Sequence, residues 1–399
     1  MTARVMAGAD PRAWAEALDA RLREIHALTP DLAFRPGAQV RVSSPKLGLE
    51  HTFLAGEARA DRAGPIRADT GFHVASVGKA MTATLVLQAA EAGLLGPQGL
   101  DRPVADFGDL SDMVSRSKVL SDRRVTLRRM LTHTSGLRDA FSDDASRTAA
   151  ENGGAPAPGS LGARLRADPD RGRIWRPWDP DAPGEPDAGV LNWFLCTGAG
   201  DAPVFAPGEA FHYSDTAYVV LGLLVERLSG RSYGALLRDR IFALLGMTNT
   251  FLAYADEAPA GWEAVVSDFM YGGRPLFSSQ GGASWDWGGG GQISTALDLE
   301  RFLRGLFGGR LLRSTTEMRA YLPVDGMPPY CVGLGLGVRR LISPGGRVLE
   351  GHAGAWSVQA FYCEDLDATI TGTFNRPMSD PSLRNWVLDV ADSLEHLAR

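Results

Sequence analysis

Segments that favour β-strands occur at the two ends of this chain, and segments that favour helices lie between them. Residues 39–42 and 51–56 alternate apolar and polar side chains, which predicts a β-hairpin with its turn near Pro45. Towards the C-terminus, short turns separate four more strand-like segments, residues 334–338, 347–350, 357–362 and 368–374. We therefore expect one antiparallel sheet built from both ends of the chain, with a helical unit inserted between them.

This order of elements predicts an α+β protein with two domains, as a length of 399 residues also suggests. Residues 1–100 and 270–399 are expected to form the sheet domain, and residues 101–269 a mainly helical domain. Apolar side chains recur at helical spacing in 11–28 and 381–397, so we expect a helix from each end of the chain to flank the sheet.

The segment 141–208 is rich in Gly, Pro, Asp and Ala, and large aromatic residues are scattered through it, among them Trp175, Trp178, Trp193 and Phe194. A segment of this length without regular structure is usually either a disordered insertion or a lid over a site. The aromatic side chains favour a lid that packs on the rest of the protein.

The composition argues against several classes of function. A net charge of −6 without basic runs disfavours binding to nucleic acid or to an anionic membrane surface. The chain has no apolar run long enough for a membrane anchor or a secretion signal, so we expect a cytoplasmic protein. Cys196, Cys331 and Cys363 are far apart and are expected to be buried apolar residues, without a disulfide or a metal.

Neither a metal nor a cofactor is expected. The sequence has no H-E-x-x-H motif and no cluster of His and Cys, which argues against a metal. Gly288–Gly291 could cradle a phosphate but lacks the G-K-[ST] ending of a P-loop, so a close approach of backbones near a pocket is favoured. The absence of G-x-S-x-G argues against an α/β-hydrolase nucleophile.

A serine and a lysine, Ser76 and Lys79, lie at the start of a long apolar helical segment. Residues three apart on a helix share one face, so we expect the hydroxyl and the amine to lie within reach of each other. Lys46, Lys79 and Lys118 are the only lysines among 41 Lys and Arg residues. Because a buried lysine can lose its proton whereas arginine cannot, a lysine here suits proton transfer. The alternative interpretation is purely structural: Ser76 caps the helix, and Lys79 is a solvated side chain.

Two further motifs follow in order, Y-S-D at 213–215 and H-A-G at 352–354. Together with Ser76-x-x-Lys79 they resemble the three motifs of the serine beta-lactamase and penicillin-binding-protein superfamily. The likeness is closest to the branch of class C beta-lactamases and D-alanyl-D-alanine carboxypeptidases, and it covers roughly residues 35–380. It implies a beta-lactamase-like fold, in which the sheet carries the N- and C-terminal helices and an inserted helical domain.

The resemblance also implies a role for each motif residue. Ser76 would be the acylated nucleophile, Lys79 its activating partner and Tyr213 a second general acid or base. The backbone N–H groups of Ser76 and Ala355 would form the oxyanion hole. Substrate contacts are expected from four other residues, Asp215, His352, Gly354 and Trp287, although Trp287 could equally belong to the core.

Two motif residues depart from the family pattern. Asp215 stands where the family's lactamases and carboxypeptidases carry asparagine, and His352 stands where the lactamases carry lysine. An ionised aspartate can only accept hydrogen bonds, which argues against beta-lactam hydrolysis and favours a substrate with a free amine or hydroxyl near the scissile bond. The segment 133–136, His-Thr-Ser-Gly, could supply a second nucleophile, but its place at a predicted helix end favours a structural cap.

The sequence therefore predicts a serine hydrolase or acyltransferase that acts on a small-molecule ester or amide through an acyl-enzyme on Ser76. One alternative is a biosynthetic transacylase that uses an amine or alcohol acceptor, which a water-excluding lid would favour. Another is a D-amino-acid amidase or aminopeptidase. A true beta-lactamase or carboxypeptidase is less favoured, and a non-catalytic binding protein conflicts with the intact Ser76, Lys79 and Tyr213.

Overall fold

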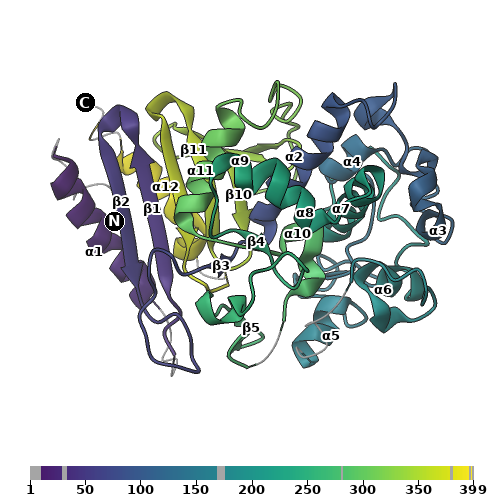
Figure 1. The fold of residues 1–399 in the computed structure, drawn as a ribbon, viewed down its shortest axis with the longest axis horizontal. Coiled ribbons are helices and arrows are strands. Elements are labelled where there is room, and N and C mark those ends of the chain that lie inside the picture. The colour runs from purple at the N-terminus through teal and green to yellow at the C-terminus, as the bar shows by residue number, and fades with distance from the viewer. Residues whose placement is uncertain are drawn as a thin grey trace.

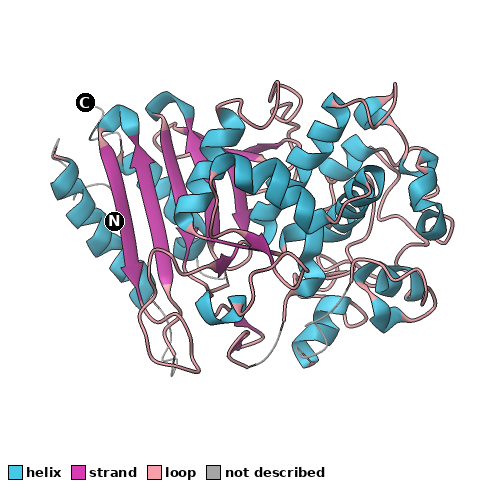
Figure 2. Cartoon of the chain, viewed as in Figure 1, coloured by secondary structure: helices cyan, strands magenta, loops and turns pink. Residues whose placement is uncertain are grey.

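The computed structural model describes residues 10–28, 34–168, 176–279, 282–377, 381–394 and 397. Its main feature is a seven-stranded sheet with the order β2-β1-β12-β11-β10-β9-β8, seen on the left of Figures 1 and 2. Neighbouring strands are antiparallel throughout. The strands are β1 Ala38–Ser44, β2 Leu49–Ala55, β8 Cys331–Leu334, β9 Arg339–Ile342, β10 Val348–Gly354, β11 Val358–Cys363 and β12 Ala368–Thr373.

The N-terminal hairpin joins the C-terminal strands through β1 and β12, where Val40 lies opposite Gly372. This pairing confirms that one sheet is built from both ends of the chain. The hairpin turn lies where it was predicted, and it takes the form of a short 3-10 helix over Pro45–Leu47, which Gly48 closes with a φ of 62°.

Helices cover both faces of the sheet. Helices α1 (Pro11–Ala27) and α12 (Pro381–Ser393) pack on one face, and α11 (Ala296–Phe307) packs on the other. Successive side chains of β11 point to opposite faces of the sheet. Phe361 belongs to the core beneath α1 and α12, whereas its neighbour Ala360 belongs to the larger core on the opposite face. The terminal helices are therefore placed as the sequence predicted.

The helices of the middle of the chain lie beside the sheet, on the right of Figure 1. Helix α2 (Gly78–Glu91) is buried along most of its length and packs against α7 (Asp215–Ser229) and α10 (Trp287–Gly290). The remaining helices are α3 Ser111–Val114, α4 Leu127–Leu131, α5 Leu161–Ala167, α6 Val190–Cys196, α8 Tyr233–Leu237 and α9 Ala243–Leu245. The residue boundaries expected for the two domains remain a prediction.

A second, small sheet has the order β3-β7-β4 and connects the two regions. Strand β3 (Phe72–His73) pairs with β7 (Gln292–Ser294), which also pairs with β4 (Phe251–Leu252). A separate two-stranded sheet joins β5 (Met270–Tyr271) to β6 (Arg274–Pro275). Because β3 runs directly into the segment that contains Ser76, the small sheet fixes the approach of the chain to this residue.

One strand assignment from the sequence was wrong. Residues 334–338 are not a strand, because β8 ends at Leu334 and the chain reverses at Gly337, whose φ is 71°. A Cβ on Gly337 would lie 2.8 Å from the Lys79 carbonyl oxygen, so glycine allows this turn to touch α2. The turn starts β9, which the sequence analysis missed because the Leu-Gly alternation resembled a continuous strand.

The segment 141–208 packs on the helical region through buried aromatic side chains, Trp178, Trp193 and Phe194. Trp175 lies outside the described residues. The predicted packing is therefore confirmed for three aromatics, and movement as a lid stays a prediction. The prediction of buried cysteines holds for Cys331 and Cys363 but is wrong for Cys196, which is exposed at the end of α6.

Candidate active site

Ser76 lies in a 3-10 turn, Ala75–Val77, immediately before α2. The turn is held from both sides: the Val74 N–H donates to the Gln292 carbonyl at 3.0 Å, and the Ala75 N–H donates to His73 Nδ1 at 3.1 Å. Ala75 has a φ of 48°, which is unusual for a residue with a side chain. The nucleophile candidate therefore sits on a strained, well-fixed turn, a common property of functional residues.

Lys79 is in the first turn of α2 and is fully buried. Its Nζ donates to Ser76 Oγ at 3.1 Å and to the Gly289 carbonyl at 2.7 Å, and it forms an ion pair with Asp215 Oδ1. The predicted proximity of hydroxyl and amine is confirmed, and a solvated lysine is ruled out.

The glycine run brings three backbones together around this lysine. A Cβ on Gly290 would lie 2.0 Å from the Ala75 carbonyl oxygen, and one on Gly288 would lie 2.4 Å from the Tyr218 carbonyl oxygen. On the α2 side, a Cβ on Gly78 would lie 2.8 Å from the Gly290 Cα. Side chains at these positions would separate α2, α7 and α10. The predicted close approach of backbones is confirmed.

Tyr213 precedes α7 and faces the same lysine, with Lys79 Nζ 5.0 Å from the centre of its ring. Burial raises the pKa of the Tyr213 hydroxyl, and the positive charges of Lys79 and Arg339 offset only part of this effect. Tyr213 is therefore a neutral phenol at rest, able to donate a proton. The structure thus brings Ser76, Lys79 and Tyr213 together, as the motifs predicted.

His133 positions Tyr213. Its ring stacks on the Tyr213 ring at 4.3 Å between centroids, and its Nδ1 accepts a hydrogen bond from the Ser214 N–H at 3.1 Å. Burial, together with the charges of Lys79 and Arg339, lowers the pKa of His133 well below its usual value, so the ring is neutral. The segment 133–136 therefore has a structural role, which is the alternative that the sequence favoured.

Two buried carboxyl groups near Asp215 were missed by the sequence analysis. Burial and the nearby charge of Asp215 raise the pKa of Asp286 to about 8 and that of Asp139 to about 7. Asp286 Oδ2 lies 4.0 Å from His73 Nε2, and Asp139 Oδ1 accepts from the Asp215 N–H at 3.1 Å. The available sequence signal for Asp286 is its position between two tryptophans, which is unusual for an exposed aspartate.

Asp215 determines the charge of Lys79. Burial alone would lower the pKa of Lys79, but the attraction of the Asp215 carboxylate outweighs burial and raises the pKa. Lys79 is therefore an ammonium in the unliganded site. It must lose a proton before it can accept one from Ser76.

The third motif, residues 352–354, ends strand β10 beside the turn Ala75–Val77 that contains Ser76. A Cβ on Gly354 would lie 2.6 Å from the Val74 carbonyl oxygen, so the two segments are in direct backbone contact. His352 is buried, and burial with the charge of Arg339 lowers its pKa well below the usual value. Ala355 is exposed next to Gly354. The oxyanion hole of Ser76 and Ala355 remains a prediction, as does a substrate contact of His352.

Arg339, on β9, is a second residue that the sequence analysis missed. It lies opposite Gly351 of β10, and its Cζ is 5.5 Å from the centre of the Tyr213 ring. Within the described ranges, no carboxylate forms an ion pair with this guanidinium. The sequence could not single it out, because β9 itself was not predicted and arginine is abundant in this chain.

Trp287 does not join this group. It packs against Gly222 of α7, with a closest approach of 3.4 Å to the position of a Cβ there, and against the Tyr233 ring at 5.4 Å. A role of Trp287 in substrate binding remains a prediction. Its contacts are those of a core residue, which is the other role that the sequence allowed.

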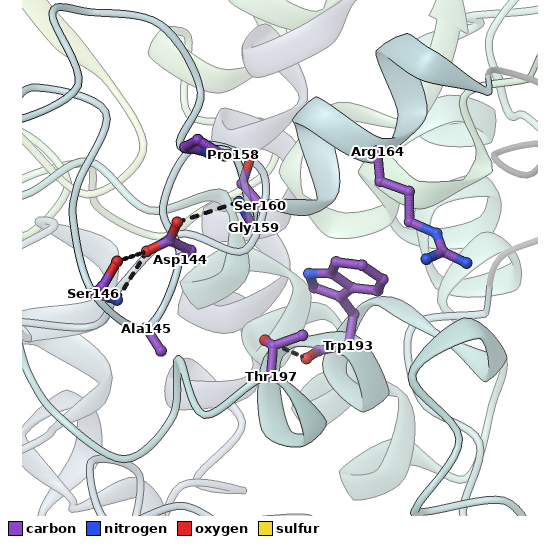
Figure 3. Close-up of a pocket in the computed structure, with 9 residues that line it drawn as sticks. All are labelled: Asp144, Ala145, Ser146, Pro158, Gly159, Ser160, Arg164, Trp193 and Thr197. Atoms are coloured by element: carbon purple, nitrogen blue, oxygen red, sulfur yellow. Dashed lines mark hydrogen bonds between the residues drawn. The ribbon is translucent and has the colours of Figure 1, made fainter.

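A hollow of about 540 Å³ lies elsewhere, between the segment 144–164 and α6, and it contains none of the motif residues. Figure 3 shows its lining, in which the Trp193 ring lies between Asp144 and Arg164. Asp144 accepts hydrogen bonds from the backbone of Ser146 and Gly159. The Asp144 carboxylate is thus occupied in holding the loop together.

Among the residues that the structure describes, no group of three His, Cys, Asp or Glu side chains is arranged to hold a metal ion. No helix in these ranges is long and apolar enough to cross a bilayer.

Comparison with known proteins agrees with the motifs. Residues 35–392 match the family described as Beta-lactamase. The chain belongs to the beta-lactamase family. The predicted superfamily and fold class are thereby confirmed, and membership of this family agrees with the predicted class of serine hydrolase. The comparisons do not single out the class C branch.

Sequence relatives within this family include penicillin-binding protein 4 of Amycolatopsis lactamdurans, which is 30% identical over 59% of this chain and 47% of its own length. The D-aminopeptidase of Brucella ovis is 30% identical over 45% of this chain and 35% of its own length. This chain thus spans about half, or less, of these two curated relatives.

Solved structures match over nearly the whole chain. A D-stereospecific amidohydrolase from Streptomyces sp. is 25% identical, with a TM-score of 0.66 over 94% of this chain and 97% of its own. The D-amino acid amidase of Ochrobactrum anthropi SV3, in complex with L-phenylalanine amide, is 20% identical, with a TM-score of 0.70 over 97% of this chain and 99% of its own. The second likeness concerns the fold alone.

Proposed function

We propose that this protein hydrolyses the amide bond of small D-aminoacyl amides or short peptides with a free amino group, through an acyl-enzyme on Ser76. The observation that carries the proposal is the contact of Ser76 Oγ with Lys79 Nζ at 3.1 Å, beside a carboxylate, Asp215, in place of the family's asparagine. A carboxylate near the nucleophile suits a substrate that carries an ammonium group. Two of the relatives are named as a D-stereospecific amidohydrolase and a D-aminopeptidase, and these names support this class of substrate.

The reaction assigns one step to each residue. Ser76 Oγ attacks the substrate carbonyl while its proton moves to the deprotonated Lys79 amine. The Tyr213 hydroxyl then protonates the leaving nitrogen as the C–N bond breaks, and Tyr213 regains a proton from Lys79. Water resolves the acyl-enzyme by the reverse sequence of proton transfers. Backbone N–H groups at Ser76 and Ala355 would stabilise the oxyanion of both tetrahedral intermediates.

The position of Arg339 favours a particular kind of leaving group. Its guanidinium faces Tyr213, the proposed acid for that group, and has no carboxylate partner among the described residues. A leaving group that ends in a carboxylate, such as glycine released from a D-aminoacyl dipeptide, would supply this partner. We therefore expect D-alanyl-glycine to have a lower KM than D-alaninamide, and Arg339→Ala to remove the difference.

The activity is tested with the D- and L-alanine p-nitroanilides, by absorbance of released nitroaniline. We expect turnover of the D-isomer by the wild-type protein and no turnover by Ser76→Ala. Intact-mass measurement after treatment with a fluorophosphonate should show one covalent addition, which Ser76→Ala should lack. A protein that gains no mass is a binding protein, and the proposal is then wrong.

Transfer of the acyl group to an amine or alcohol remains a prediction. It is tested by offering candidate amines with the same D-alanyl donor and weighing the products. Free D-alanine as the sole product at every amine concentration would exclude it. The cytoplasmic location also remains a prediction, which cell fractionation with an antibody to this chain would test.

A further inference from the structure

The ion pair between Lys79 and Asp215 conflicts with the role of Lys79 as a base. Lys79 is completely buried, whereas the side chain of Asp215 keeps 20% of its surface exposed. Among the described residues, Lys79 is the one cation paired with this carboxylate. The exposed part of the Asp215 carboxylate therefore faces solvent. Its other part pairs with Lys79 and keeps this amine protonated.

Other charged and titratable groups surround this pair on every side. Asp286 comes from the turn before α10, Asp139 from the loop before α5, and Arg339 from β9. The neutral neighbours are Tyr213, Tyr218, Tyr233, His133 and His352. Asp286 and Asp139 hold their protons more tightly than ordinary aspartates, so Asp215 is the principal negative charge at Lys79.

We infer that the ammonium group of the substrate takes over Asp215 from Lys79, and that this exchange switches Lys79 from an acid into the base that activates Ser76. The inference rests on the proposed function, because it requires a substrate with a free amine. Its physical basis is the single carboxylate shared by two cations. When the substrate ammonium pairs with Asp215, Lys79 loses its counter-ion and gains a positive neighbour, and both changes favour its neutral form.

The protons balance in this scheme. On substrate binding, the Lys79 ammonium releases one proton to solvent. The neutral amine accepts the Ser76 proton as the bond from Oγ to the carbonyl carbon forms. As the C–N bond breaks, the Tyr213 proton goes to the leaving amine, and Lys79 returns its proton to Tyr213. Acyl groups without an amine bind in the same place but leave Lys79 protonated, so they react slowly.

The first test compares D-alanine p-nitroanilide with propionyl p-nitroanilide, which lacks only the amine. For the wild type at pH 7 we expect kcat/KM to favour the D-alanine substrate by about 100-fold or more, the effect of moving a neighbouring pKa by two units. In Asp215→Asn the preference should fall below about 10-fold, partly because kcat/KM for the propionyl substrate rises. Equal losses for both substrates, or an unchanged preference, would overturn the inference.

The second test needs no aminoacyl substrate. The rate at which a small, neutral fluorophosphonate labels Ser76 is measured against pH by intact mass. We expect the midpoint of this profile to lie at least about one pH unit lower in Asp215→Asn than in the wild type, because the amide cannot hold the proton on Lys79. Identical profiles would show that Asp215 does not restrain Lys79, and the exchange would be wrong.

A carboxylate outside the site provides the matched control. Asp112→Asn removes a carboxylate that pairs with Arg227 outside this site, and it should leave both the substrate preference and the labelling profile unchanged. If wild-type protein cleaves no D-aminoacyl anilide, the proposed function fails, whereas the labelling profiles still decide whether Asp215 holds Lys79 in its protonated form. Circular dichroism of Asp215→Asn should match that of the wild type.

Discussion

Replacing Gly290 by alanine should displace Ser76, the proposed nucleophile, without changing any of the proposed catalytic side chains. A Cβ at this position would lie 2.0 Å from the Ala75 carbonyl oxygen, 2.2 Å from its carbonyl carbon and 2.9 Å from its Cα. All three atoms belong to the backbone that directly precedes Ser76, so rotation of a side chain cannot relieve the overlap. The turn and α10 must separate by about 1.5 Å to restore ordinary contact.

A displacement of this size at a nucleophile typically lowers the rate about 100-fold, which corresponds to about 2.7 kcal/mol of transition-state stabilisation. We expect kcat/KM of Gly290→Ala for D-alanine p-nitroanilide to fall by about this factor, with the main loss in kcat. The distance from Lys79 Nζ to Ser76 Oγ, now 3.1 Å, should lengthen in a crystal structure of the variant.

The chain offers a control glycine with nearly the same φ. Gly64 has a φ of 152°, close to the 156° of Gly290, but a Cβ there would meet no atom within 4 Å. Gly64→Ala therefore reproduces the backbone strain without the overlap, and its kcat/KM should stay within threefold of the wild type. If Gly290→Ala were as active as Gly64→Ala, the argument that the glycine run positions Ser76 would be refuted.

Three further predictions concern the partners of the site. Tyr213→Phe should lower kcat for the anilide by about 100-fold or more while the fluorophosphonate still labels Ser76, because the phenol protonates the leaving nitrogen. His133→Phe keeps a ring against Tyr213 but leaves the Ser214 N–H without its acceptor, so we expect a loss of about 1–3 kcal/mol in chemical denaturation. Asp286 has a pKa of about 8 in the folded protein, above the value of 3.8 for a free aspartate, so the stability that it contributes is complete below about pH 4 and is lost as the pH rises to 8. The melting temperature of Asp286→Asn relative to wild type should therefore increase between pH 5 and pH 8, and a constant difference would contradict this assignment.

The sequence contained enough information to predict the three motifs, because each places its chemistry within a few neighbouring residues. The spacing of Ser76 and Lys79 already implies their contact, and the structure places the two side chains 3.1 Å apart. Local patterns of this kind also predicted the terminal helices and the hairpin.

The sequence could not reveal interactions between distant segments. Arg339, Asp286 and Asp139 acquire their importance from the charges that the fold places beside them, and no local pattern records this. The same holds for Asp215, which was expected to contact substrate and is paired with Lys79 in the unliganded site. The turn at Gly337 was missed because its glycine serves a contact with α2, nearly 260 positions earlier in the chain.

The sheet assembled from both ends of the chain also sets the order in which activity can arise during synthesis. Ser76 and Lys79 leave the ribosome early, but the Gly289 carbonyl that binds Lys79 and the Gly354 segment that supports the Ser76 turn are made more than 200 residues later. Strand β1 pairs with β2 early, but it gains its second neighbour only after β12 has been made. A nascent chain therefore carries the proposed nucleophile without its environment, and we expect the proposed activity only when the C-terminal strands have been added.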